Sequence, residues 1–192
     1  MNNSIQHINN AIIPPKTQKP KLNLTPSGVA WATWYKQNIG QCDVAVALHL
    51  PMHLAHKPNP TPLKGRLRQL LNRLDTHFFG RQYHRNNQRI PRLVMLEYSP
   101  DCGWHAHMAI KLTKNGHRKQ ITVEEMQERI KKYWLLINGA KDAFAERGVY
   151  AQPQHGNYVG YMLKTEGKEC LQGELDIFNT CADKLRLTAQ PN

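Results

Sequence analysis

The sequence predicts an α+β protein with a central, mainly antiparallel β-sheet and flanking helices. Residues 92–99 and 104–112 are strand-like apolar segments, and the tight connection Pro-Asp-Cys-Gly between them predicts an antiparallel hairpin. Apolar side chains recur at helical spacing over residues 63–78, and a Thr-x-x-Glu capping box at Thr122 opens a second helical pattern. Hairpin-connected strands beside amphipathic helices favour a sandwich of helices on a sheet.

The first half of the chain is expected to hold an arm, a short helix, a strand and a longer helix. Residues 1–26 are polar and rich in proline and lysine, which predicts a flexible basic N-terminal arm. Residues 27–40 run from a serine suited to capping to a glycine suited to ending, and predict a short helix. Residues 42–50 are mostly apolar and include the β-branched Val44 and Val46, which predicts a buried strand. The proline-rich residues 51–62 predict a loop. The helix over 63–78 then buries one side, formed by Leu63, Leu67, Leu70, Leu71, Leu74 and Phe78.

The second half continues from the hairpin with a helix, a strand and a short helix. The capping box at Thr122 opens a helix that Gly139 is expected to end. Residues 148–153 predict a short strand, and a short helix follows from Asn157. Residues 27–166 are therefore expected to form one domain, while the tail over 167–192 carries weak signals and is left unassigned.

The charge of the chain points to a polyanionic partner. Lysine and arginine number 26 against 14 aspartates and glutamates, a formal net charge of +12. Such an excess on a small protein favours nucleic acid as the partner, although an ordinary basic enzyme is the alternative. The basic side of the helix over 63–78 is a candidate phosphate-binding surface or a merely solvated face; its residues are Lys64, Arg66, Arg68 and Arg73.

The sequence predicts a cytoplasmic protein with no membrane partner. No segment approaches 18 consecutive apolar residues, and the first residues lack the regions of a secretory signal. Cys42, Cys102, Cys170 and Cys181 show no Cys-x-x-Cys spacing, which favours reduced thiols over a disulfide framework.

Two histidines on the second strand of the hairpin form a candidate metal site. His105 and His107 are two residues apart, so their side chains are expected on one face of the sheet. If residues 99–103 form the turn, Glu97 lies opposite His105 and Met95 lies opposite His107. Two imidazoles and a carboxylate on one face would make an open, three-ligand site of the catalytic type.

Other interpretations of this region remain open. Cys102, three residues before His105, raises the alternative of a structural zinc site, although no second Cys-x-x-Cys accompanies it. A polar hairpin that binds no metal is a further alternative. His49, in the preceding strand, is a candidate phosphate or metal neighbour, or a histidine of the core or sheet edge.

A tyrosine and a lysine on the short helix near residue 160 form a candidate nucleophilic site. At helical spacing Val159 and Leu163 centre the apolar side, whereas Tyr161 and Lys164 lie close to the opposite side. Tyr158 lies nearer the apolar edge. A tyrosine hydroxyl titrates near 10 and needs help to act as a nucleophile, which a metal on a phosphodiester and a nearby cation would supply.

These motifs together resemble a known enzyme family. Glu97 on one strand, His-Ala-His at 105–107, the strand Val-Tyr-Ala-Gln-Pro and the helix Tyr-Val-Gly-Tyr-Met-Leu-Lys follow one another as in the HUH endonucleases. The resemblance covers roughly residues 42–166. This family includes replication initiators of rolling-circle plasmids and small phages, transposases and relaxases. The resemblance implies an antiparallel sheet whose central strands carry the histidines, with the tyrosine helix packed over them.

The resemblance also implies roles for the site residues. His105, His107 and Glu97 become metal ligands, Tyr161 the nucleophile, and Lys164 its accompanying base or phosphate contact. The Tyr-x-x-Lys form is more similar to replication initiators, including small filamentous-phage and prophage proteins, than to small insertion-sequence transposases.

The spacing of the two tyrosines departs from part of the family. Family members with two catalytic tyrosines space them four apart, whereas Tyr158 and Tyr161 are three apart. This spacing favours a single-tyrosine enzyme, with Tyr158 as a candidate second tyrosine.

The leading hypothesis, which the resemblance implies, is a metal-dependent, site-specific nickase and ligase. It would initiate rolling-circle replication of a phage, plasmid or satellite element in the cytoplasm of a bacterial host cell. It would act on single-stranded DNA or an origin hairpin through a 5′-phosphotyrosine intermediate, with Mg²⁺ or Mn²⁺ as the ion. The sequence contains no P-loop, so a host helicase is expected as a partner. A transposase or relaxase is the alternative of the same chemistry. A basic DNA-binding protein with a structural metal site and no cleavage is the alternative of another class.

Overall fold

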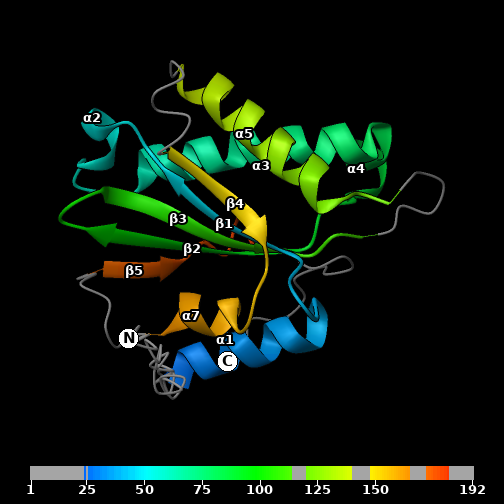
Figure 1. Cartoon of the computed structure of the whole chain (residues 1–192), viewed down its shortest axis with the longest axis horizontal. Helices are drawn as coiled ribbons and strands as arrows, with labels where there is room; N and C mark the ends of the chain where they lie inside the picture. Colours follow the sequence, from blue (N-terminus) through cyan, green and yellow to red (C-terminus); the bar gives the residue numbers. More distant parts are fainter. Residues whose placement is uncertain (1–23, 25, 114–119, 140–147, 165–171, 182–192) are drawn as a thin grey trace, which may run out of the picture.

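A computed structural model describes residues 24, 26–113, 120–139, 148–164 and 172–181. Within these residues, five strands form one antiparallel sheet in the order β4-β1-β3-β2-β5 (Figure 1). The predicted α+β class is confirmed. The strands are β1 (Val44–His49), β2 (Arg92–Ser99), β3 (Gly103–Ile110), β4 (Val149–Pro153) and β5 (Gln172–Leu175).

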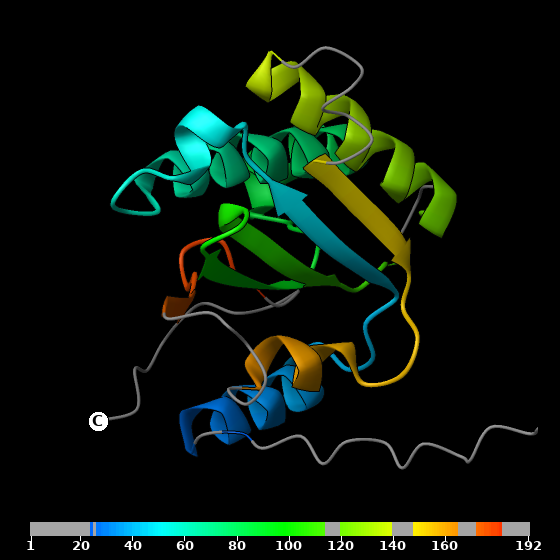
Figure 2. The ribbon, with the colours of Figure 1, turned by 60° about the vertical axis from the view of Figure 1, so that its left-hand side comes forward.

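Helices cover both faces of the sheet. The longer helices α3 and α5 lie over one face, and α1 and α7 lie side by side over the other (Figure 2). None of the helices in the described part of the chain has the length and apolar character needed to cross a membrane. The helices are α1 (Pro26–Asn38), α2 (Met52–Ala55), α3 (Thr61–Phe79), α4 (Arg81–Asn86), α5 (Val123–Asn138) and α7 (Tyr158–Leu163).

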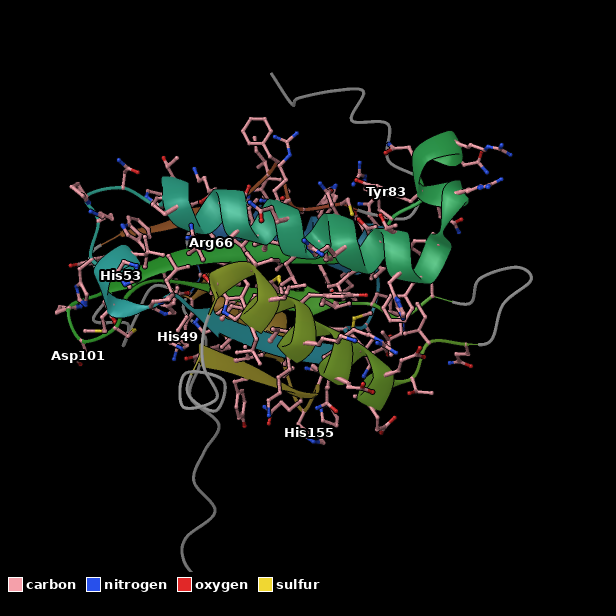
Figure 3. The ribbon with its side chains drawn as sticks, turned by 90° about the horizontal axis from the view of Figure 1, so that it is seen from above. His49, His53, Arg66, Tyr83, Asp101 and His155 are labelled. Carbon is pink, nitrogen blue, oxygen red and sulfur yellow. The ribbon has the colours of Figure 1, made fainter. Side chains whose placement is uncertain are left out.

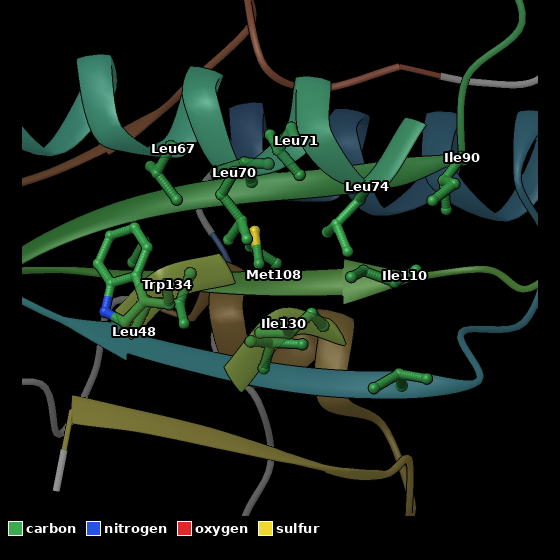
Figure 4. Close-up of a cluster of buried hydrophobic side chains, with 14 of the residues drawn as sticks. Leu48, Leu67, Leu70, Leu71, Leu74, Ile90, Met108, Ile110, Ile130 and Trp134 are labelled. Carbon is green, nitrogen blue, oxygen red and sulfur yellow. The ribbon is translucent and has the colours of Figure 1, made fainter. Parts of the chain in front are cut away.

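The first face of the sheet is apolar and packs against α3 and α5 (Figure 4). All of the side chains predicted for the buried side of α3 are buried, and they lie over Met108 and Ile110 of β3 and Leu48 of β1. Trp134 of α5 is fully buried, and its Nε1 donates to the carbonyl of His49 at 2.9 Å. Because each fully buried side chain of this size contributes about 1.5–3 kcal/mol, this face holds the larger part of the core.

The second face carries a smaller apolar cluster. Leu93 of β2 and Ala109 of β3 form this cluster with Met162 and Leu163 of α7 and Tyr35 of α1. These residues alternate along the strands with those of the first face, as the period of two requires. The small cluster therefore holds α7 against the face of the sheet to which the two histidines of β3 point.

Helix boundaries follow local chemistry, with two differences from expectation. The Thr122 hydroxyl accepts from the Glu125 amide at 3.1 Å, so the predicted cap of α5 is confirmed. Helix α1 begins at Pro26 rather than after Ser27. Proline suits a first helical turn because it has no backbone N–H that would need an acceptor there. Helix α7 ends at Leu163, since the next residue is extended.

Three short elements lie where the sequence carries no clear signal. Helix α2 falls in the segment predicted as a loop, and α4 follows α3 after Gly80. Strand β5 pairs with β2 beyond residue 166, where the predicted domain ends. Most of the predicted arm over 1–26 lies outside the described residues, but Leu24 forms a β-bridge with Lys164.

Gly103 at the start of β3 is a position where a side chain is not tolerated. Its φ is +67°, and a Cβ added there would lie 2.5 Å from the carbonyl carbon and oxygen of Ala55. We expect Gly103→Ala to lower the free energy of unfolding by more than about 2 kcal/mol, through backbone strain and displacement of α2. Gly65→Ala in α3 is the matched control. A methyl there meets no atom within 4 Å, so denaturant unfolding should show a gain of about 0.5–1 kcal/mol.

Candidate metal centre and nucleophile

Glu97, His105 and His107 meet on one face of the hairpin, as the predicted register requires. Glu97 lies directly opposite His105, and Met95 lies opposite His107. The Nε2 atoms of the two histidines are 3.8 Å and 3.6 Å from the same carboxylate oxygen, Oε2 of Glu97. The three side chains are between 6% and 12% exposed. The hairpin of central strands thus brings two imidazole nitrogens and one carboxylate oxygen close together near the protein surface.

The Nδ1 atom of each histidine lies within hydrogen-bonding distance of an oxygen atom. His105 Nδ1 lies 3.0 Å from the carbonyl of Gly103, which can only accept, so Nδ1 is the protonated nitrogen. His107 Nδ1 lies 3.2 Å from the hydroxyl of Tyr158, and that hydroxyl donates to the carbonyl of Val46 at 2.8 Å. The oxygen of Tyr158 is therefore the acceptor for His107. The unprotonated Nε2 atoms of both rings then face Glu97, which is the usual arrangement around histidine metal ligands.

This donor set fits a divalent cation. The three ligand atoms lie within 4.8 Å of one another. A buried carboxylate is costly unless a cation or a hydrogen-bonded charge balances it. Two imidazoles and one carboxylate leave further positions of an ion to water or substrate, which distinguishes such a site from a closed structural site.

Helix α7 places Tyr161 and Lys164 beside this cluster. The rings of His107 and Tyr161 have centroids 6.0 Å apart, and Tyr161 is 42% exposed. Lys164 follows the last residue of the helix, and its Nζ lies 4.7 Å from the centroid of the Tyr161 ring. Helical spacing predicts that Tyr161 lies on the exposed side of this helix, and the structure agrees. Tyr161, Lys164 and the predicted metal ligands therefore lie close together.

Tyr158 occupies a different environment from Tyr161. Its ring stacks on that of Tyr161 with centroids 6.0 Å apart, but its hydroxyl is engaged by His107 and Val46. Burial raises the pKa of Tyr158 well above its ordinary value of 10. A hydroxyl that is hard to ionise and already bonded on both sides is unsuited to attack. Of the two tyrosines, Tyr161 is therefore the better candidate for a nucleophile.

His49 is a neighbour of the cluster whose position the sequence left open. It pairs with His105 across β1 and β3, and the two rings stack at 5.2 Å with an interplanar angle of 10°. Burial and the nearby His105 lower the pKa of His49. Cys102 also lies beside His105, with its Sγ atom 3.5 Å from His105 Nδ1.

The basic residues predicted to bind phosphates lie away from this site. Lys64, Arg66, Arg68 and Arg73 belong to α3, which covers the opposite face of the sheet; Figure 3 shows Arg66 on that side. Lys64 pairs with Glu174 at 2.6 Å, and Arg66 Nε donates to Asn138 Oδ1 at 2.8 Å. Arg68 and Arg73 are exposed. A DNA strand at the metal cluster would have to pass around the sheet to reach them.

Removing the Tyr158 hydroxyl is expected to weaken metal binding without removing a ligand. In Tyr158→Phe, His107 loses the acceptor that orients its ring, and loss of such a partner costs about 10- to 100-fold in metal affinity. Calorimetric titration with Mn²⁺ measures this change. Tyr150→Phe is the matched control, because the Tyr150 hydroxyl bonds only to Gln152 among the described residues and lies on the edge strand. Equal Mn²⁺ affinities in the two variants would contradict the role of Tyr158.

Comparison with known proteins gives no relative: no protein-family model, no curated protein and no solved structure matches the chain, so its function is argued from the geometry of this site.

Proposed function

We propose that the chain is a divalent-cation-dependent endonuclease and ligase of single-stranded DNA, with Tyr161 as its nucleophile. The observation that carries this proposal is the meeting, on one sheet face, of an accessible phenol, a lysine and a three-ligand cluster. Each feature alone is common on protein surfaces. Their combination supplies a nucleophile, a counter-charge and a place to bind a phosphate-polarising ion.

The proposed reaction exchanges one phosphoester for another. The phenolic oxygen of Tyr161 forms a bond to the scissile phosphorus, and the bond from phosphorus to the 3′-oxygen breaks. The hydroxyl proton of Tyr161 leaves to solvent, and the departing 3′-oxygen takes up a proton. The products are a 5′-phosphotyrosine link and a free 3′-hydroxyl. Attack by a 3′-hydroxyl on the phosphotyrosine reverses these steps and rejoins the strand.

Each residue of the site has a distinct task in this reaction. Glu97, His105 and His107 would hold the ion, which would polarise the phosphodiester and offset its charge. Lys164 presents its ammonium beside the Tyr161 ring, where negative charge develops during attack. Tyr158 keeps His107 in the ligating tautomer.

Initiation of rolling-circle replication is the biological role that we propose for this chemistry. A nick that leaves a free 3′-hydroxyl provides a primer, while the phosphotyrosine conserves the bond for rejoining. The resemblance of the Tyr-x-x-Lys helix to replication initiators and the net charge of +12 support a DNA origin as substrate. Mg²⁺ or Mn²⁺ is the proposed ion, with the two imidazoles favouring Mn²⁺. A host helicase would unwind the duplex.

The proposal is tested by trapping the covalent product. The protein is incubated with single-stranded oligonucleotides that tile the DNA around its gene, with Mn²⁺ or with Mn²⁺ plus EDTA. We expect a denaturation-resistant protein–DNA adduct on one oligonucleotide, which EDTA abolishes. DNA binding without any adduct across the tiled set would instead identify a non-catalytic DNA-binding protein.

A further inference from the structure

A second set of potential ligands lies at the turn end of the hairpin. Cys102 in the turn, His49 at the end of β1 and His105 of β3 bring one sulfur and two imidazoles together. The ligand atoms of these residues lie within 4.8 Å of one another. His105 belongs to this set and to the one that contains Glu97, but it presents a different ring atom to each.

The spacing of the sulfur and nitrogen atoms suits tetrahedral coordination. A zinc ion with Zn–S near 2.3 Å and Zn–N near 2.0–2.1 Å places ligand sulfur and nitrogen about 3.5 Å apart. Cys102 Sγ is 3.5 Å from His105 Nδ1. The Ser99 hydroxyl lies 2.8 Å from the same sulfur and can support it as a hydrogen-bonding neighbour. To bring this pair onto one ion, His105 Nδ1 gives up its hydrogen bond to the Gly103 carbonyl, which lies 3.0 Å away and has to turn aside.

We propose that His49, Cys102 and His105 form a second metal site, selective for thiophilic divalent cations such as Zn²⁺, Co²⁺ and Cd²⁺. Thiolate ligands select these ions, whereas Mg²⁺ and Mn²⁺ prefer oxygen-rich sets. The half-buried position of Cys102 and His49 gives such an ion access from solvent and leaves its fourth position to water.

Occupation of this site competes with cation binding at Glu97 and His107. A neutral imidazole has one nitrogen with a free lone pair and one that carries a proton. When His105 Nδ1 binds a thiophilic ion, its proton is lost to solvent and Nε2 takes one up, so Nε2 no longer serves the other set. The Cys102 thiol also releases its proton on binding. This competition rests on the proposed cation site at Glu97.

Cobalt titration tests the second site directly. Thiolate-bound Co²⁺ gives an intense near-ultraviolet charge-transfer band, which we expect in the wild-type protein and in Glu97→Gln. Cys102→Ser should lose the band, and its Zn²⁺ affinity should fall at least about tenfold, since even outer-shell losses cost that much. Cys181→Ser is the matched control, because that thiol bonds to the Ile90 carbonyl at a remote site. A band that survives Cys102→Ser, or that is absent from wild type, would overturn the proposal.

Displacement of Mn²⁺ tests the competition. The electron paramagnetic resonance signal of free Mn²⁺ is followed while Zn²⁺ is added to the Mn²⁺-loaded protein. We expect about one equivalent of Zn²⁺ to release Mn²⁺ from wild type, and at least about tenfold more to be needed for Cys102→Ser. Superimposable curves would contradict the competition. Neither measurement uses DNA, so a failure here is distinguishable from a failure to cleave.

Discussion

Replacing Tyr161 with phenylalanine is expected to abolish the covalent protein–DNA adduct while leaving affinity for single-stranded DNA nearly unchanged. The variant keeps the ring that lies beside His107 and under the Lys164 ammonium, and loses only the attacking oxygen. Loss of a covalent nucleophile should lower nicking by at least about 1,000-fold. Adduct formation on a denaturing gel and DNA affinity by fluorescence anisotropy separate the two effects.

Tyr158→Phe is the matched control, because it removes a hydroxyl from the stacked ring of the same helix. That variant should cleave more weakly at low Mn²⁺ and recover at saturating Mn²⁺, since its defect is in metal binding. Tyr161→Phe should not recover at any Mn²⁺ concentration. If instead Tyr161→Phe cleaved normally and Tyr158→Phe did not, the nucleophile would be Tyr158.

The pairing of Glu97 with His105 was predictable because the information for it is local. A short turn joins two alternating strands, so the loop length sets the register, and a slip of one residue would bury the wrong face. The position of His49 was not predictable in the same way. Its contact with His105 depends on β1 pairing with β3 across more than fifty residues, and no short-range signal specifies that partner.

The side of the sheet on which a helix packs also lies beyond local pattern. Helical spacing correctly separates the apolar and basic sides of α3, but it does not tell that α3 covers the face opposite Glu97. For α7, spacing identifies the exposed tyrosine, whereas its place over the histidines follows from the small cluster around Met162. Strand β5 has only four residues without apolar alternation, and its position is set by its pairing with the edge of β2.

The segment after β5 is joined to the core by a buried ion pair. Arg92 at the start of β2 contacts Asp75 of α3 at 2.9 Å, and the two side chains are 4% and 0% exposed. Asp75 Oδ1 also accepts from the Ile90 amide at 2.9 Å, and Arg92 Nε donates to the Asn179 carbonyl at 3.0 Å. The Asp75–Arg92 pair thus links α3, β2 and the residues that follow β5.

Replacing Asp75 with alanine is expected to have the largest effect on stability among the substitutions considered. It leaves the Arg92 guanidinium buried without its counter-charge, and breaking a buried pair in this way costs about 3–5 kcal/mol. Denaturant unfolding measures the loss. Glu174→Ala is the matched control: it breaks the exposed pair with Lys64, which should cost less than about 1 kcal/mol. Asp75→Asn keeps an acceptor for the Ile90 amide, so its loss of stability should lie between those of Asp75→Ala and Glu174→Ala. A cost below about 1 kcal/mol for Asp75→Ala would mean that water or another group compensates Arg92.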